Sequence, residues 1–418
     1  MAARSTRRRA LTAAGAVLAA AALLVACAPD TRIEVDAPEQ AAVELPEETR
    51  AQLDAAVQNA MAATASTGAI VGVWAPWSGS WVAGIGADAA GTPVDADMSF
   101  RVADVTRMMT CDVLYAVAAE GTVALDDPVV DWVAGYPNLT DVTLQDLCDG
   151  TAGIGNYEAV IGGSWITNPE RVWDPLEIAS FGLGQPRSAV GTEYRNSDAG
   201  YALLGMALER ATATRMATLL ERYIFEPLEL EDTQLPRDRA AAPGANPLPG
   251  YRIVNNPDGS LNCAEPRDMT VISASLGYAD SGVVSTVEDL GRYVQAVAVG
   301  ATATDVDRWS DPLPVFAGAP AWYTTTGGAL QAGSLIGQYG SVPGYMTAAF
   351  ADPATGTTVV VVLNNSTASA DVVRDLSWEL AAIASRAPAT SGFTAPEFGL
   401  PWTAEQYRES VSQTNICR

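Results

Sequence analysis

Lysine and histidine are both absent from this chain, and their absence limits the chemistry that it can do. Serine–lysine, serine–histidine and cysteine–histidine pairs are excluded, because each needs one of the missing residues as its base. The five cysteines also lack a metal-site pattern, since no C-x-x-C spacing occurs and no histidine could complete one. We therefore expect no metal ion and no other cofactor.

The amino terminus has the pattern of an export signal. Four arginines within the first nine residues precede an uninterrupted small and apolar run, Ala10 to Ala26, which ends in the sequence LVAC. This pattern resembles the bacterial lipoprotein signal, in which cleavage before the cysteine leaves that cysteine lipidated. An uncleaved membrane helix is the alternative, but about 17 apolar residues is at the short limit for spanning. We predict a signal peptide over residues 1–26, a lipid anchor on Cys27 and a tether over 27–46.

The exported part is strongly acidic. From position 27 onward, 20 arginines face 49 acidic residues, a formal charge of −29. Such a charge repels nucleic acid, so we expect no nucleic-acid partner. With Cys27 lipidated, four cysteines remain in a compartment that permits disulfides, and they can pair in three ways or stay as buried thiols.

The periodicity of apolar residues predicts strands near both ends of the chain and helices between them. We expect helices over 47–65, 108–120, 199–210 and 369–385, and strands over 69–74, 80–85, 345–350 and 357–363. This order indicates an α+β fold, an antiparallel sheet flanked by helices with an inserted, mainly helical subdomain. The predicted boundaries are a domain over 47–385, a helical insertion over about 104–275, and a carboxyl-terminal tail over 386–418 that packs on the domain.

Six motifs follow one another along the chain. They are FRVADVTRMMT (100–110) continuing to EG and LDDPV, VTLQDL (142–147) leading to TAGI, YRNSDAGYALLG (194–205), IFEPL (224–228), SGVVSTVEDL (281–290) and QYGSVPGY (338–345). In this order they resemble the landmarks of the serine β-lactamase and penicillin-binding-protein family, over roughly residues 50 to 385. The resemblance implies the β-lactamase/DD-peptidase-like fold and a cleft built for acyl transfer to a serine.

The first motif departs from the family at its two reacting positions. There the family has S-x-x-K, in which the lysine takes the proton of the serine, whereas this chain has Asp104 and Arg107. An aspartate that attacked an amide would form a high-energy anhydride, and arginine stays protonated and cannot act as a base. The two side chains can pair across one helical turn, so they either lock the helix start or contact a ligand.

The other motifs imply a binding cleft that keeps some of the functional residues of the family. Tyr194 and Asn196 match the tyrosine that assists proton transfer and the asparagine that holds a substrate amide, although such residues can also merely cap and pack. Gln338 replaces the histidine or lysine of the third motif, Gly340 is kept, and the backbone N–H of Ser341 stands at the oxyanion hole. We predict no catalytic residue, and a ligand-binding set that comprises Asp104, Arg107, Tyr194, Asn196, Gln338, Gly340 and Ser341.

The resemblance also implies how the cysteines pair. In the family fold, the helix after the first motif lies near the loop at Cys148, so Cys111 is expected to bond to Cys148 beneath the cleft. Cys263 and Cys417 would then join and hold the carboxyl-terminal tail.

Two classes of function follow. The favoured one is a pseudoenzyme: a lipid-anchored envelope protein on the outer face of the bacterial cytoplasmic membrane that binds a cell-wall peptide or an envelope protein. The alternative is a hydrolase of changed chemistry that uses Asp104 and Tyr194 as acid and base. An orthodox carboxypeptidase or β-lactamase is disfavoured because its lysine and histidine are missing.

Overall fold

The structure is a computed structural model that describes residues 32–417 apart from 89, 237, 238, 304, 305 and 398. The predicted signal peptide and Cys27 lie outside the described residues. From residue 33 onward, the described residues form one compact unit. Within the described residues, no helix combines the length and the apolarity needed to cross a membrane.

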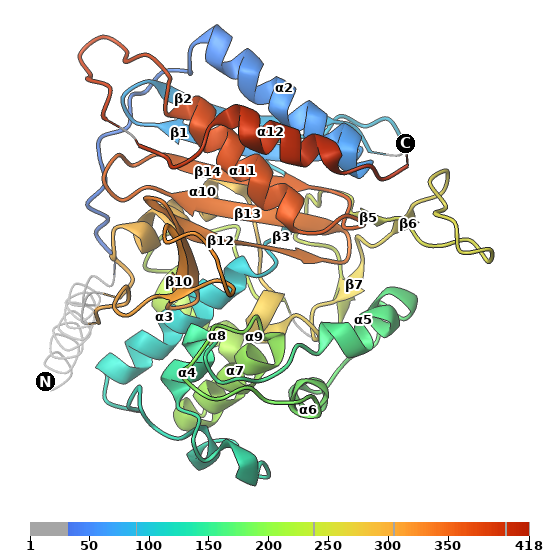
Figure 1. The fold of residues 1–418 in the computed structure, drawn as a ribbon, viewed down its shortest axis with the longest axis vertical. Helices are drawn as coiled ribbons and strands as arrows, with labels where there is room; N and C mark the ends of the chain where they lie inside the picture. The colour runs from blue at the N-terminus through green and yellow to red at the C-terminus, as the bar shows by residue number, and fades with distance from the viewer. Residues whose placement is uncertain (1–31, 89, 237–238, 304–305, 398, 418) are drawn as a thin grey trace, which may run out of the picture. The chain divides into compact units, whose positions relative to one another are not determined.

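One antiparallel sheet organises this unit (Figure 1). In the described residues its strands run in the order β2-β1-β14-β13-β12-β11-β10-β9. Their bounds are β1 Gly68–Ala75, β2 Gly79–Gly86, β9 Leu313–Pro314, β10 Tyr323–Thr326, β11 Ala329–Ala332, β12 Leu335–Val342, β13 Tyr345–Ala351 and β14 Thr358–Leu363. The central strand β14 has the sequence TVVVVL and is buried along its whole length, as expected of a strand covered on both faces.

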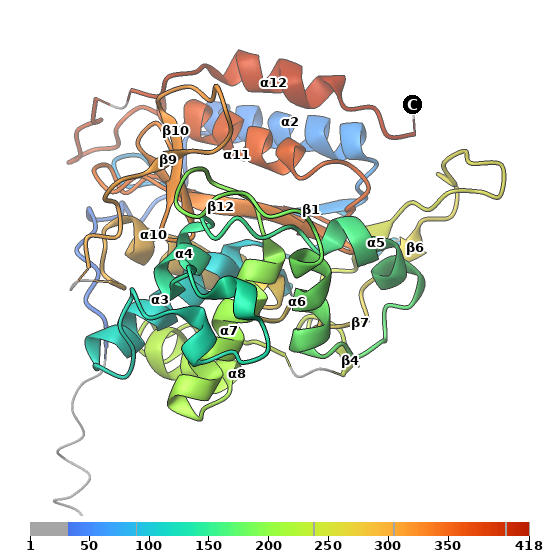
Figure 2. The same cartoon turned by 60° about the horizontal axis from the view of Figure 1, so that its bottom comes forward.

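Helices cover both faces of the sheet. On one face lie α2 (Glu47–Thr64), α11 (Asp371–Ala384) and α12 (Ala404–Gln413), and on the other lies α10 (Val287–Ala298) with the helical region beyond it (Figure 2). Alternate residues of the strands supply the two cores, because successive side chains point to opposite faces. Val359 and Val361 belong to the core under α11, whereas Val360 and Val362 belong to the core shared with the helical region.

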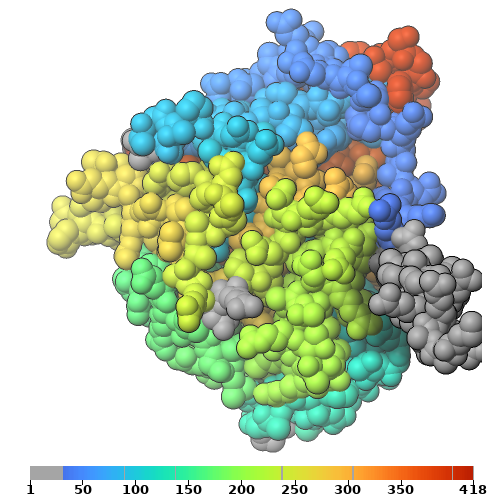
Figure 3. Space-filling model, turned by 180° about the vertical axis from the view of Figure 1, so that it is seen from behind, coloured from blue at the N-terminus to red at the C-terminus, as the bar shows by residue number. Residues whose placement is uncertain are grey.

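The helical region lies between β3 (Phe100–Arg101) and β8 (Val284–Ser285), which pair with each other. Its helices are α3 Val105–Ala119, α4 Leu144–Asp149, α5 Glu158–Thr167, α6 Pro175–Leu183, α7 Asp198–Thr212, α8 Met216–Leu220 and α9 Tyr278–Ser281, with short helices at Val129–Asp131, Pro137–Leu139 and Glu221–Phe225. Two short strand pairs join β4 (Ala240–Ala241) to β7 (Ile272–Ser273) and β5 (Tyr251–Arg252) to β6 (Arg267–Asp268). Seen from behind, the chain around α7 and α8 fills the centre of the face, and the segment from β5 to β6 projects at one side (Figure 3).

The predicted α+β class is confirmed, and so are the elements on which it was based. The helices expected over 47–65, 108–120, 199–210 and 369–385 are α2, α3, α7 and α11, and the four expected strands are β1, β2, β13 and β14. Their strong periodicity reflects burial on at least one face. The structure adds β9 to β12 and α12, which the sequence pattern does not indicate.

The segment expected to be the end of the tether packs against the domain instead. Leu45 and Ala41 are buried, and the backbone N–H of Ala41 donates to the carbonyl of Pro76. Glu44 forms a bridge beside Ser80 at the edge of the hairpin. The ordered unit therefore begins well before Glu47, because this extended segment pairs with an edge that would otherwise be open.

Both disulfides implied by the family resemblance are present. Cys111 on α3 is bonded to Cys148 on α4, and Cys263 in the projecting β5–β6 segment is bonded to Cys417. The backbone N–H of Ile416 also donates to Ala63 at the end of α2. The chain end is therefore held between α2 and the projecting segment.

Candidate functional site

The seven residues predicted to bind a ligand line one cavity. Its volume is about 420 Å³, and its walls come from the start of α3, the segment before α7, helix α5 and strand β12. Residues far apart in the sequence meet here because α3 runs beneath the sheet beside β12, while α7 and α9 pack against α3. The cavity therefore gathers in space the motifs that follow one another along the chain.

Asp104 occupies the position before the first residue of α3 but does not cap the helix. Aspartate at this position usually accepts a hydrogen bond from the first turn, whereas here the side chain makes no such bond. Ala103 just before it has a φ of 51°, a left-handed conformation that costs a non-glycine residue about 1 kcal/mol or more. The backbone is thus bent so that the Asp104 carboxylate turns toward β12 rather than along the helix.

Gly340 on β12 makes room for that carboxylate. A Cβ atom at Gly340 would lie 2.4 Å from both Cγ and Oδ1 of Asp104, well inside van der Waals contact. Gly340 therefore leaves the space that the Asp104 carboxylate occupies.

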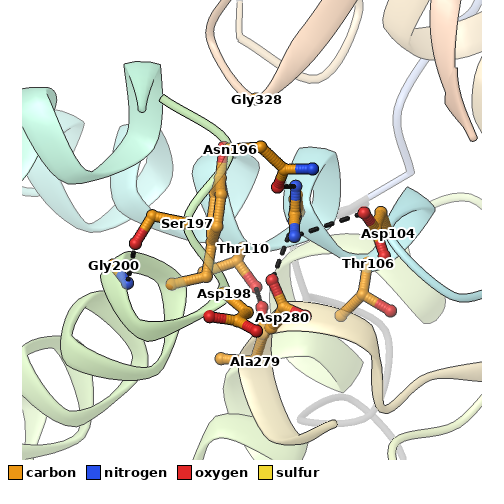
Figure 4. Close-up of polar contacts among 12 residues, drawn as sticks. Asp104, Thr106, Thr110, Asn196, Ser197, Asp198, Gly200, Ala279, Asp280 and Gly328 are labelled. Carbon is orange, nitrogen blue, oxygen red and sulfur yellow. Dashed lines mark hydrogen bonds and ion pairs between the residues drawn. The ribbon is translucent and has the colours of Figure 1, made fainter. Parts of the chain in front are cut away.

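Arg107 bonds to Asp104, Asp280 and Asn196, which are labelled in Figure 4. Its guanidinium lies 3.2 Å from Oδ2 of Asp104 and 2.8 Å from Oδ1 of Asp280, and it donates over 2.6 Å to Oδ1 of Asn196. The aromatic ring of Tyr201 lies beneath it, 5.0 Å away. With a side chain only 4% exposed and three of its nitrogens engaged, Arg107 is a buried cross-link.

Two threonines hold the same helix to the segment that carries Asp280. Thr110 donates to the carbonyl of Ala279 over 2.6 Å (Figure 4), and the hydroxyl of Thr106 accepts from the N–H of Val283 over 3.2 Å. Asp280 is consequently fixed opposite Arg107 and not free to follow a ligand.

Tyr194 and Asn196 lie on the short segment before α7. The ring of Tyr194 packs over Gly150, whose φ of 70° suits glycine. Arg195 between them turns away and donates to the carbonyls of Gly153 and Pro186, so both neighbours face the cavity. The side-chain carbonyl oxygen of Asn196 accepts a hydrogen bond from Arg107. The Tyr194 hydroxyl has no hydrogen-bond partner among the described residues.

The Gln338 side chain lines the cavity and forms a hydrogen bond within the sheet. Its side chain is buried, and its Nε2 donates over 3.1 Å to the carbonyl of Gly328 in the turn between β10 and β11. Ser341, three residues on, lies in β12 opposite Met346 of β13. The Gln338 amide is thus engaged in a contact within the protein.

A comparison with family models matches residues 53–383 to the family described as Beta-lactamase. The match covers most of the chain and includes all seven residues of the cavity set. The chain belongs to the beta-lactamase family.

Within this family the chain resembles several curated hydrolases over part of their length. It is 30% identical to Esterase EstB of Burkholderia gladioli over 158 residues, which is 34% of this chain and 40% of the esterase. It is also 30% identical to the D-alanyl-D-alanine-carboxypeptidase/endopeptidase AmpH of Escherichia coli over 149 residues, 33% of this chain and 37% of AmpH. The matched segments thus span well under half of these relatives.

Solved structures of the family confirm the fold. The D-amino acid amidase from Ochrobactrum anthropi, in complex with D-phenylalanine, aligns with a TM-score of 0.65 at 19% identity and covers 80% of this chain and 99% of the amidase. The penicillin-binding protein from Bacillus halodurans aligns with a TM-score of 0.61 at 20% identity, covering 77% and 97%. At this identity the likeness extends to the fold alone.

In this member of the beta-lactamase family, the cavity also has acidic walls that the motifs did not single out. Asp280, Asp198, Glu158 and Asp371 line it, together with Arg252. Asp198 lies within the third motif and Asp280 directly precedes the fifth, so only Asp198 belongs to a motif. No group of three or more candidate metal ligands occurs in the described part of the chain.

Burial raises the pKa values of two of these carboxyl groups. Asp104 has a pKa raised to about 8 by burial, although Arg107 favours its ionised form. Asp198 has a pKa raised to about 7 by burial and by Asp280, although it accepts hydrogen bonds from the N–H groups of Tyr157 and Glu158. The Tyr194 pKa is raised to about 12, also chiefly by burial. At neutral pH, Asp104 is therefore largely protonated and Tyr194 keeps its proton.

These shifts predict that stability falls as pH rises from about 4 to about 8. Across that window the folded protein binds more protons at Asp104 and Asp198 than the unfolded chain, whose aspartates have the ordinary pKa of 3.8. We expect the melting temperature to decrease between pH 5 and pH 8, and Asp104→Asn to flatten this dependence. Thermal melts of both proteins across the range measure it, and a wild-type profile that rises toward pH 8 would contradict the assignment.

Gly340→Ala should destabilise the protein by about 1–3 kcal/mol, because the new methyl group overlaps the Asp104 carboxylate. If that overlap is the cause, Asp104→Ala should relieve part of the loss, because it removes the two nearest atoms but keeps the Cβ of residue 104, 2.7 Å from the new methyl group. A double-mutant cycle in urea gives the coupling energy, and additive effects of the two changes would show that the close approach is unimportant.

Proposed function

We propose that this chain is a non-catalytic binding or scaffolding lipoprotein of the cell envelope, which keeps the family cleft for a cell-wall peptide or a protein partner. The observation that carries the proposal is the state of Asp104. It stands where the family has its nucleophile, its carboxyl group has a pKa raised to about 8, and the cation beside it is an arginine. A largely protonated carboxyl group next to a permanently protonated guanidinium supplies neither nucleophile nor base.

The retained groups support a binding role. Tyr194 presents a hydroxyl without a hydrogen-bond partner in the described residues, and β12 forms one wall of the cavity. The Arg107 cross-link fixes the walls in one arrangement, which lowers the cost of ordering a site when a ligand binds.

Placement at the envelope is the second part of the proposal. It rests on the LVAC sequence, on the two disulfides, and on relatives whose names include a penicillin-binding protein of Bacillus subtilis. Cys27→Ala should move the protein from the membrane fraction to the soluble fraction of the producing cells. Retention of the variant in membranes would contradict lipid anchoring at this cysteine.

Restoring the family residues tests whether only the reacting groups are missing. We expect the triple variant Asp104→Ser, Arg107→Lys, Gln338→His to hydrolyse a chromogenic cephalosporin or a p-nitrophenyl ester, whereas the wild-type protein does not. The matched control carries Asp104→Ala with the other two changes, so that only the hydroxyl differs. Turnover by the wild-type protein that Asp104→Ala abolishes would overturn the non-catalytic proposal.

A hydrolase of altered chemistry is the second candidate, because a carboxyl group with a pKa of about 8 is suited to general acid–base catalysis. The curated relatives named above are hydrolases, which also favours it. This candidate requires that Asp104→Asn and Tyr194→Phe both abolish turnover of an ester or D-amino acid amide. Absence of turnover by the wild-type protein at every pH from 5 to 9 would eliminate it.

A further inference from the structure

Residues 33–45 form an extended strap that lies on the folded unit. Burial alternates along its first residues: Ile33, Val35 and Ala37 are partly buried, whereas Glu34 and Asp36 are exposed. Ile33 and Val35 pack against the core that the sheet shares with the helical region. Such a period of two is typical of an extended chain with one face on a core. The strap is therefore part of the fold from its first residue.

Backbone hydrogen bonds hold the strap at both ends. At its start, the N–H of Ile33 donates over 3.0 Å to the carbonyl of Pro227. At its end, the N–H of Leu45 donates over 2.9 Å to the carbonyl of Ser80. A segment held in this way does not add its length to a flexible linker.

The chain between the predicted lipid anchor and the strap is short. Cys27 and Ile33 are six residues apart, and a fully extended chain of that length spans at most about 21 Å. A free tether over residues 27–46 would reach about 65 Å by the same measure. A lipid on Cys27 would therefore keep the start of the strap within about 21 Å of the anchor.

The strap starts at the carboxyl-terminal end of α3. Pro227, which accepts its first hydrogen bond, closely follows the short helix Glu221–Phe225. Two residues of that helix bond to Glu120 at the end of α3, Arg222 over 3.1 Å and Tyr223 over 2.8 Å. Helix α3 begins at the cavity, and its 15 residues span about 22 Å. The start of the strap and the cavity thus lie at opposite ends of one helix.

We infer that the strap holds the carboxyl-terminal end of α3 next to the outer surface of the lipid bilayer, with the cavity at the end of α3 that is farther from the membrane. The short chain between Cys27 and Ile33 determines which end of the helix faces the lipid. This inference rests on the lipid anchoring in the proposed function and adds an orientation to it.

A short tether gives this orientation without any affinity for lipid. The chain is strongly acidic from Cys27 onward, so anionic head groups would repel it. Covalent attachment keeps the end of α3 close to the bilayer despite this repulsion, because it sets a high local concentration. The cavity would then meet ligands close to the membrane rather than in the outer layers of the cell wall.

The absence of lysine allows the orientation to be measured, because one introduced lysine is the only side-chain amine of the chain. Glu226→Lys places it beside Pro227. Glu265→Lys places it in the segment between β5 and β6, which projects on the side away from the start of the strap (Figures 1 and 3). Both glutamates are exposed, so the two variants are matched.

Energy transfer to the membrane reports the distance of each lysine from the lipid. Each full-length lipoprotein is labelled with an amine-reactive fluorophore and incorporated into phosphatidylglycerol–phosphatidylethanolamine vesicles that carry an acceptor dye. The lysine-free wild type gives the background from the amino terminus. Transfer should be at least about threefold more efficient from position 226 than from position 265, because the tether keeps position 226 close to the bilayer. Equal transfer, or greater transfer from position 265, would overturn the inference.

Releasing the strap tests whether it sets the orientation. In both lysine variants, Ile33→Ser with Val35→Ser removes the apolar contacts and lengthens the free tether, so the difference between the two positions should fall to less than about half. Glu34→Gln with Asp36→Asn is the matched control at exposed positions and should leave the difference unchanged. A difference that survives release of the strap would contradict the inference.

Flotation of the vesicles keeps the two proposals apart. If the wild-type lipoprotein does not float with the vesicles, lipid anchoring fails and the orientation is overturned with it. If the protein floats but transfers equally from both positions, lipid anchoring stands and the orientation alone is wrong.

Discussion

Arg107→Met is expected to destabilise the protein by about 3–5 kcal/mol, because it leaves the buried Asp280 carboxylate without its cation and the Asp104 carboxyl group without its donor. Asp280 is 5% exposed at its side chain and Asp104 is 16% exposed, so water cannot replace the lost partner fully. Asn196 also loses the donor to its carbonyl oxygen. Urea denaturation followed by circular dichroism measures the loss.

Three further variants separate this effect from a simple loss of packing. Arg107→Met combined with Asp280→Asn should recover part of the stability, since the unpaired charge of Asp280 is removed. The stability of Arg107→Lys should lie between those of the wild type and Arg107→Met, because an ammonium group cannot replace a planar guanidinium that bonds to three partners. Arg222→Met, at an ion pair with Glu120 on the surface, should cost less than about 1 kcal/mol. If Arg107→Met behaved like Arg222→Met, the buried cross-link would have no energetic importance.

Removing the Cys111–Cys148 disulfide is expected to cost about 4 kcal/mol. The bridge closes a loop with a sequence separation of 37, and the chain entropy that it removes from the unfolded state gives a value of that size. It also joins α3, which carries Arg107, to α4, whose last turn accepts a hydrogen bond from Tyr201 at the carbonyl of Cys148. The double variant Cys111→Ala, Cys148→Ala should therefore unfold at a lower urea concentration.

Peptide mapping of the unreduced protein should first recover Cys111 with Cys148 and Cys263 with Cys417. The comparison variant Cys263→Ala, Cys417→Ala should free the chain end and expose the residues after α12 to protease while the urea midpoint of the helical region changes less. Free thiols in the purified protein, or equal stability with and without reductant, would contradict the role assigned to the inner bridge.

The sequence predicts those elements whose apolar pattern is set by burial. Strands β1, β13 and β14 and helix α11 lie in the middle of the layers, and their periodicity follows from the cores on their two faces. Strand β10 reads YTTT and β12 contains two glycines, so neither shows an apolar period. Their pairing depends on neighbours distant in sequence, which local propensity cannot report.

The same distinction holds in the cavity. The motif order places Asp104, Tyr194 and Gly340 together, and the structure does so too. An aspartate before a helix ordinarily indicates a cap, and only the bend at Ala103 with the position of Arg107 shows that Asp104 faces β12. The acidic wall formed by Asp280 and Glu158 likewise depends on how α9 and α5 pack, which no single motif contains.

The central claim, that the acyl-transfer machinery is gone, is tested most directly by the intact mass of the protein after incubation with a fluorescent penicillin. We predict that the wild-type protein shows no added mass and no fluorescence after denaturation, while the triple variant with Ser at 104, Lys at 107 and His at 338 gains one penicilloyl group. A wild-type protein that carries a denaturation-stable adduct would contradict the claim, whichever residue bears it.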